Sequence, residues 1–386
     1  WVLTAHCMIW GGWYGIPVPQ PKIAVDIFML VSGFLMVFQY RARQETEPLD
    51  KPATAARFWL RRFFRIAPAY YLFLLTATVL WSSYSAGFGE LQHANPERWG
   101  NLPQYTNAPK PQMDAANILM HVTFIFGLIP RYSFSTLSPD WSIGLEMQFY
   151  AVFPLLYFVL RKYSWAVISL GALALEIFIH RWFGRIPGPA PGAMGLFPEP
   201  SFLPLKLSLF VAGMLCGEAF CLNRVRLSVE TGIMAIVAVI LGAAHSHYVL
   251  AVVAFFLFAG LTQGREPASL EGQTMRIARH LLDNRVMRFM ADVSYSVYLF
   301  HSMVISIGGA WLFRNAGFLK LAPPVRVGVL FAMVATLSYG GGWLLHRFVE
   351  QPGIKLGRRV SDRLFSKGRR PPPPPDSSVA STAPSR

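Results

Sequence analysis

Long apolar segments separated by short polar ones dominate the sequence. A helix that crosses the hydrocarbon core of a bilayer needs about 20 consecutive, mostly apolar residues. Ten segments meet or approach this requirement, if an incomplete one at the start is counted: 1–14, 23–40, 66–83, 141–160, 164–181, 204–222, 229–245, 247–264, 291–313 and 325–346. The pattern predicts an all-α, polytopic integral membrane protein with about ten transmembrane helices.

One further apolar run, residues 117–130, is short for a span and ends in Pro130. We expect it to form a re-entrant or interfacial helix. Counting it as a full span would move several basic loops to the outer side, against the tendency of Lys and Arg to stay in cytoplasmic loops.

Charge supports this class of protein. Charged residues make up 14% of the chain, whereas soluble proteins average about 25%. The net charge is +15, and the bases lie between and after the apolar runs. The first such segment contains Arg41, Arg43, Lys51, Arg57, Arg61, Arg62 and Arg65. With ten spans this segment is cytoplasmic, so we expect an inner-membrane protein whose intact chain has both termini in the cytoplasm. The bases do not alternate with polar residues as in nucleic-acid binders.

The organisation along the chain is simple. Residues 1–360 form one predicted transmembrane domain, and residues 361–386 form a basic, Pro-rich cytoplasmic tail that we expect to be disordered. The chain begins with Trp1 inside an apolar segment, from which we expect that an N-terminal part is missing. The three cysteines lie in or beside apolar runs, and no disulfide framework or metal site is predicted.

Ionisable side chains inside predicted spans are functional candidates, because each costs roughly 2.5–3.5 kcal/mol on insertion scales. His6 lies in the first span, Asp26 near the outer end of the second, and Glu146 early in the fourth. The alternative for His6 is a hydrogen-bonded core histidine. Asp26 is alternatively an interfacial cap, or the partner of a neighbouring histidine.

Two predicted spans carry polar stripes. Tyr150 lies four residues after Glu146 on the same helix face, although Trp141 and Tyr150 are also explained as interfacial aromatics. In the span 291–313, Ser294, Tyr298 and His301 follow one another on one face. A stripe of this kind indicates either a lined cavity or hydrogen bonding between helices, and this segment alone leaves both open.

Arg62 and Arg65 share a helix face at the i, i+3 spacing just before the third span. Guanidinium groups bind phosphates through paired hydrogen bonds. Orientation of the protein and attraction to anionic lipid explain the same bases without a ligand.

Six segments in the same order resemble the membrane acyltransferase-3 family, which includes bacterial glycan O-acetyltransferases. They are His6, Ala24–Phe34 (AVDIFMLVSGF), Arg62–Tyr70 (RFFRIAPAY), Trp141–Pro154 (WSIGLEMQFYAVFP), Ser294–His301 (SYSVYLFH) and Phe348–Pro352 (FVEQP). The resemblance covers about residues 1–360. Ala24 replaces a family glycine and Gln351 replaces a common arginine. The family's basic residue eleven positions before the histidine would lie upstream of Trp1.

The resemblance implies an integral membrane O-acyltransferase. Such an enzyme moves an acyl group, most often acetyl, from cytoplasmic acyl-CoA to a hydroxyl of a cell-surface or exported glycan. His6 would be the general base or the transient acyl carrier, because histidine titrates near neutral pH. Asp26 or Glu146 would orient it or hold its charge.

The same resemblance assigns binding roles. Arg61, Arg62 and Arg65 would bind the phosphates of acyl-CoA, the donor substrate, without a metal. The acceptor site would be lined by Trp141, Tyr150, Ser294, Tyr298 and His301. The expected partners are membrane lipid and a glycan or lipid-linked glycan, and no nucleic acid.

The competing hypothesis is a proton-coupled transporter or exporter of a polar or lipid-linked metabolite. The buried His, Asp and Glu would then form a proton relay. Many transporters show paired halves in their sequence, and no internal repeat is evident here.

Overall fold

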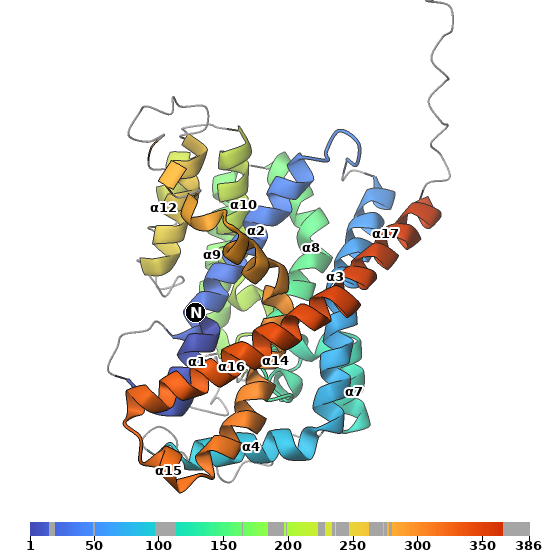
Figure 1. Ribbon diagram of the computed structural model, residues 1–386. Coiled ribbons are helices and arrows are strands. Elements are labelled where there is room, and N and C mark those ends of the chain that lie inside the picture. Colours follow the sequence, from blue (N-terminus) through green and yellow to red (C-terminus); the bar gives the residue numbers. More distant parts are fainter. Residues whose placement is uncertain are drawn as a thin grey trace, which may run out of the picture.

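The computed structural model (Figure 1) describes residues 1–14, 20–48, 51–96, 113–163, 165–183, 197, 199–222, 228–233, 236, 247–261, 273, 276, 277 and 280–365. Its helices are α1 (Val2–Gly11), α2 (Pro21–Arg41), α3 (Pro52–Val79), α4 (Trp81–His93), α7 (Ala115–Val122), α8 (Trp141–Lys162), α9 (Trp165–Phe183), α10 (Leu207–Leu222), α12 (His247–Leu261), α14 (Arg285–Phe313), α15 (Ala316–Leu319), α16 (Pro323–Leu345) and α17 (Gln351–Phe365). Short 3-10 turns add Ile125–Leu128, Pro130–Tyr132 and Leu203–Leu205. In the described ranges the regular elements are therefore all helical, as the sequence predicts.

Several helices suit a membrane. Among the described residues, α2, α8, α14 and the continuous stretch Pro323–Phe365 are long and apolar enough to cross one. Helices α3 and α4 pass the same test together but meet at an 80° bend. The apolar helices α1, α10 and α12 are shorter. The protein is thus a helical membrane protein, while the count of about ten spans stays a prediction, and most of the predicted span 229–245 lies outside the described residues.

The third predicted span, 66–83, has different bounds in the structure. Helix α3 begins at Pro52, so much of the segment expected as a basic loop is helical, and it ends at Val79. Proline at the first helical position favours this start. In residues 52–65 the bases and the apolar residues alternate with helical spacing. The mean hydropathy of this stretch is therefore low, and hydropathy alone does not reveal the helix. Beyond Val79 the chain turns into α4, which runs across the end of the bundle (Figure 1).

The segment 117–130 does not form a long helix. Helix α7 has eight residues and is followed by the turns Ile125–Leu128 and Pro130–Tyr132. Eight residues extend only about 12 Å at 1.5 Å per residue, far less than a bilayer core. The segment is therefore too short to span, as predicted, and its depth in the membrane stays a prediction.

The last helices form one long rod. Helix α16 continues through a π-helical turn, His346–Glu350, into α17. These 43 residues extend about 65 Å, about twice the thickness of a bilayer core. Figure 1 shows the rod crossing the bundle obliquely, with α17 beside the N-terminal half of α3. The helix ends at Phe365, five residues beyond the predicted domain boundary at 360, because its basic residues form the polar face of an amphipathic helix.

Helices α2 and α10 pack backbone to backbone. A Cβ atom at Gly213 would collide with the carbonyl oxygen of Leu30, and one at Gly33 with that of Phe210. Small residues allow helices in membranes to approach this closely. The contact holds α2, which carries Asp26, against α10.

We predict that Gly213→Ala lowers the stability of the protein by about 1–3 kcal/mol, because a backbone must move to admit the methyl group. Gly328→Ala is the matched control, since a Cβ there meets no atom within 4 Å. The measurement is the midpoint of thermal unfolding in detergent. Equal midpoints for Gly213→Ala and the wild type would contradict the packing described above.

Candidate active site

Two histidines from opposite ends of the sequence meet inside the bundle. His6 Nδ1 in α1 lies 2.9 Å from His301 Nε2 in α14. His301 Nδ1 lies 2.7 Å from the carbonyl oxygen of Tyr298, so this nitrogen carries the hydrogen. Its Nε2 then accepts the hydrogen bond, and His6 donates from Nδ1. This assignment leaves the lone pair of His6 on Nε2, the form in which imidazole acts as a base.

His6 lines a cavity of about 450 Å³. The walls come from α1, the start of α2, α4, α14 and the segment before α8. Most of the lining is aromatic or aliphatic, and its polar groups include His6, Lys22, Glu199 and Ser302. A mostly apolar wall with a few polar side chains is typical of small-molecule sites.

A polar stripe on α8 leads away from the histidines. Ser142 Oγ lies 2.6 Å from the hydroxyl of Tyr298, whose ring lies beside His301. One turn on, the buried Glu146 accepts hydrogen bonds from Tyr150 and, at 3.2 Å, from Ser32. Residues 142 and 150 are about 12 Å apart along a helix axis, so the stripe connects two separate parts of the interior.

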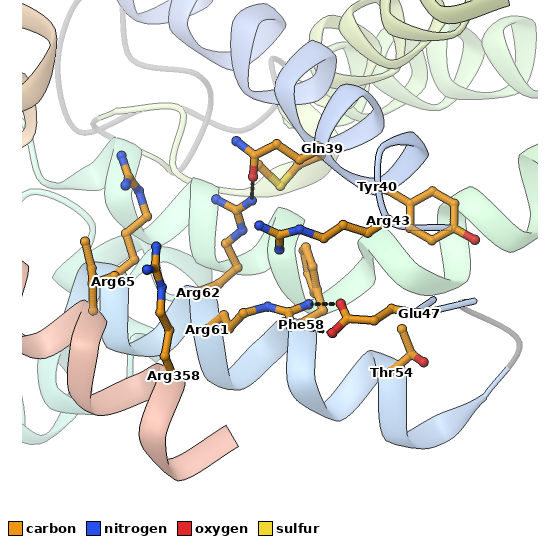
Figure 2. Close-up of a pocket in the computed structure, with 12 residues that line it drawn as sticks. Gln39, Tyr40, Arg43, Glu47, Thr54, Phe58, Arg61, Arg62, Arg65 and Arg358 are labelled. Carbon is orange, nitrogen blue, oxygen red and sulfur yellow. Dashed lines mark hydrogen bonds and ion pairs between the residues drawn. The ribbon is translucent and has the colours of Figure 1, made fainter. Parts of the chain in front are cut away.

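The far end of this stripe reaches a basic pocket. Arg62 Nη2 donates to Gln39 Oε1 at 2.6 Å, and its guanidinium lies 5.3 Å from the centre of the Tyr150 ring. Around Arg62 is a cavity of about 160 Å³, with arginines from α3, α17 and the segment after α2 in its walls (Figure 2). We call this cavity the arginine pocket; its lining includes Arg43, Glu47, Arg61, Arg62, Arg65 and Arg358.

One carboxylate lines the arginine pocket, and it is already paired. Glu47 accepts two hydrogen bonds from Arg61, at 3.0 and 2.7 Å. Burial alone would raise the pKa of Glu47, but the hydrogen bond and charge of Arg61, with Arg43 and Arg57 nearby, hold it below its usual value. Glu47 is therefore ionised, and Arg61 is neutralised by a bidentate contact.

The carboxylate expected to pair with His6 is elsewhere. Asp26 Oδ1 forms a buried ion pair with Lys206 Nζ at 2.7 Å, and Glu146 bonds to Tyr150 and Ser32. In the described part of the chain, His6 hydrogen-bonds to His301 and to neither carboxylate. The hydrogen-bond partner of His6 in the structure is thus a histidine, and the catalytic roles expected for Asp26 and Glu146 stay predictions.

The other predicted site residues do not all line one cavity. Trp141 lines the His6 cavity, and Tyr298 adjoins His301. Tyr150 lies instead between Glu146 and the arginine pocket. Ser294 is exposed and donates to the carbonyl oxygen of Ala291 on its own helix, so neither it nor Tyr150 lines the His6 cavity.

Several polar residues of the His6 cavity were missed from the sequence, among them Ser302, Lys22 and Glu199. Ser302 follows Tyr298 by four residues, and this i, i+4 spacing was a usable signal. Lys22 lies just before an apolar run, and Glu199 lies in a Pro-rich loop, where no periodicity marks a residue as facing a cavity. Within the described ranges, no three His, Cys, Asp or Glu side chains form a group suited to a metal ion.

The chain belongs to the acyltransferase domain family, whose model matches residues 1–343. Among its relatives, "Acyltransferase MdmB" of Streptomyces mycarofaciens is 27% identical over 88% of this chain and 82% of its own length. "Exopolysaccharide production protein ExoZ" of Rhizobium meliloti is 25% identical over 86% of this chain and 90% of its own.

A third relative, "Peptidoglycan O-acetyltransferase OatA" of Listeria monocytogenes, is 23% identical over 87% of this chain but only 51% of its own length. No solved structure matches the chain. The family and the names of these relatives identify the protein as an acyltransferase and disfavour the transporter hypothesis.

The buried ion pair generates a stability prediction. Lys206→Met leaves the carboxylate of Asp26 buried without its partner, so we expect a loss of about 3–5 kcal/mol. Combining it with Asp26→Asn removes the uncompensated charge and should recover much of this loss. Thermal unfolding of the two single variants and the double variant in detergent measures the coupling. If the stability losses of the two single variants simply add in the double variant, Asp26 and Lys206 do not form a direct ion pair.

Proposed function

We propose that this acyltransferase moves an acyl group, most simply acetyl, from acyl-CoA bound at the arginine pocket to a glycan hydroxyl in the His6 cavity. The observation that carries the proposal is the histidine pair itself: the bond to His301 leaves the lone pair of His6 on Nε2, inside a lined cavity. The α8 stripe between the two cavities supports a path for the reactive end of the donor.

Acyl-CoA fits the arginine pocket chemically. Its phosphates are multiply charged, and arginines bind phosphates strongly through paired hydrogen bonds. Its long pantetheine arm ends in the thioester, so phosphates and reactive carbonyl occupy different places. This separation agrees with two cavities joined by a polar stripe.

A glycan acceptor is supported by the relatives, two of which are named for exopolysaccharide production and for peptidoglycan O-acetylation. The His6 cavity has aromatic walls in Trp10, Trp13 and Trp141, against which a sugar ring can lie flat. Lys22 Nζ and Glu199 Oε2 pair with each other at 3.2 Å, and their remaining donors and acceptors can hydrogen-bond to hydroxyls.

The reaction needs one proton transfer in each direction. His6 Nε2 takes the proton of the acceptor hydroxyl as its oxygen bonds to the thioester carbonyl carbon. The carbon–sulfur bond then breaks, and the imidazolium returns the proton to the departing thiolate. In the alternative route His6 carries the acyl group transiently, which would give ping-pong kinetics.

His301 is a positioning residue in this scheme. Its Nε2 accepts from His6 Nδ1, which fixes the tautomer and ring orientation of the base and stabilises the imidazolium that forms. The carbonyl oxygen of Tyr298 holds His301 in turn.

The proposed orientation places the arginine pocket on the cytoplasmic side of the inner membrane, where acyl-CoA is present. Loops rich in Lys and Arg favour that side. The His6 cavity then faces the opposite side, toward surface or lipid-linked glycans, and both termini of the intact protein are cytoplasmic.

The first test of the proposal replaces the base. His6→Ala should lower transfer by at least about 100-fold, since general-base catalysis contributes that much or more. His280→Ala, at an exposed histidine remote in sequence from the site, is the control. The ester-linked acyl content of surface glycans is measured by mass spectrometry in cells that lack the chromosomal copy. Normal content with His6→Ala would refute the assignment. No change of glycan ester by the wild type would refute the glycan acceptor.

The second test concerns His301. His301→Ala should lower kcat at least about tenfold, because His6 is then no longer held in the tautomer that acts as the base. The KM of the donor should change little. His301→Gln should recover part of kcat, because its amide oxygen can accept from His6 Nδ1. Steady-state kinetics of the purified protein measure both. A similar loss in both variants, or a loss confined to KM, would contradict the positioning role.

A further inference from the structure

The arginine pocket has an unbalanced charge. Its lining contains five arginines and one carboxylate. Glu47 is taken by Arg61, and Arg62 is held by Gln39 and the Tyr150 ring. The remaining three guanidinium groups, among the residues that the structure describes, have no hydrogen-bond or ion-pair partner: Arg43, Arg65 and Arg358. Neighbouring like charges repel, and a bound polyanion would remove that cost.

One of these three arginines comes from the last helix of the chain. Arg358 lies on α17, more than 290 residues after Arg65. Figure 2 shows its side chain close to that of Arg65, directed toward the same space as the arginines of α3. The position of Arg358 therefore depends on the contacts that hold α17 in place.

Two glycines fix α17 against α3. A Cβ at Gly353 would lie 2.6 Å from Pro68 Cγ, and one at Gly357 would lie 2.5 Å from Phe64 Cβ. This is the Gly-x-x-x-Gly spacing that allows membrane helices to pack closely. Since Arg358 follows Gly357 and Arg65 follows Phe64, the contact places both arginines beside each other.

The turn before α17 sets its direction. In the π-helical turn, the buried Glu350 lies 3.2 Å from His346 Nδ1 and 3.3 Å from Ser296 Oγ on α14. Gln351 Nε2 lies 3.1 Å from His346 Nε2. Pro352 has no backbone N–H, which suits a place where the regular helical ladder is interrupted.

At the other end of α17, Arg57 on α3 donates to the carbonyl oxygen of Phe365. Helix α17 is thus anchored on both sides of Arg358.

We propose that α17 supplies a phosphate-binding residue of the donor site, with Arg358, Arg65 and Arg43 together binding the phosphates of acyl-CoA. The identity of the donor rests on the proposed function; the contribution of α17 is the new element. The three residues come from separate segments, so their guanidinium groups approach a diphosphate and a separate phosphate from different directions. Arg61, which the sequence nominated, instead holds Glu47 in the wall.

The chain contains a matched control for this proposal. Arg359 is the next residue on α17, has the same chemistry and is also exposed, but it does not line the arginine pocket. Replacing either arginine with Gln removes one positive charge from the same helix turn. A difference between the two variants therefore reports the pocket and not the general charge of α17.

The experiment measures the Kd of coenzyme A and of adenosine 3′,5′-bisphosphate for the detergent-solubilised full chain by calorimetry. Arg358→Gln should weaken both about tenfold, the loss expected for one charge-assisted contact. Arg65→Gln should act similarly, and Arg359→Gln should stay within about twofold of the wild type. Arg358→Lys, which keeps the charge but not the paired donors, should lie between Arg358→Gln and the wild type.

Equal Kd values for Arg358→Gln, Arg359→Gln and the wild type would overturn the proposal and leave the donor assignment standing. Failure of the wild type to bind coenzyme A would overturn the donor itself. An arginine-rich site also suits an anionic lipid headgroup, so native mass spectrometry counts the phosphatidylglycerol retained by each variant. Loss of lipid in Arg358→Gln with unchanged nucleotide binding would make the pocket a lipid site and refute the proposal.

Discussion

The interior of this bundle depends on one constraint: a charged or polar side chain removed from water needs a partner of its own. Asp26 meets Lys206, Glu218 accepts from Arg41 and Tyr157, and Glu350 meets His346 and Ser296. Each contact joins residues far apart in the sequence, except that between His346 and Glu350. The pairing of the buried polar groups therefore fixes which helices are neighbours and in which register they pack.

The same constraint explains which parts of the site were predictable. Helical spacing shows which residues share a face, so the stripe of Glu146 and Tyr150 and the pair Arg62 and Arg65 were found from the sequence alone. His6 and His301 were singled out by their places in predicted spans and by the resemblance, and their rings meet in the structure. Spacing does not show what faces a residue from another helix, and so the ion pair between Asp26 and Lys206 was not found from the sequence.

Two further differences have the same origin. Ser294 belongs to the stripe of Tyr298 by spacing, yet it is exposed, one helical turn away from the Tyr298 ring that lies beside His301. Tyr150 continues the stripe of Glu146 but lies at its other end, beside Arg62. A stripe that runs along a helix for about 12 Å passes through different environments. Periodicity assigns its residues to one line, and only the packing of the other helices divides that line between two sites.

The arginines show that two explanations of one sequence feature need not exclude each other. Bases near the ends of spans orient a membrane protein wherever their side chains point. Binding of a polyanion requires in addition that guanidinium groups converge on one space and that a carboxylate does not already neutralise their charge. Arg61 lies in the converging group, but its charge is neutralised by Glu47. Arg65 and Arg358 also lie in the group, and neither is paired with a carboxylate. In the proposed donor site, a binding arginine thus differs from an orienting one by having no hydrogen-bond or ion-pair partner within the described pocket. The sequence density of bases carries no information about that pairing, since Arg358 lies in the last helix and reaches the pocket only because Gly353 and Gly357 let α17 lie directly on α3.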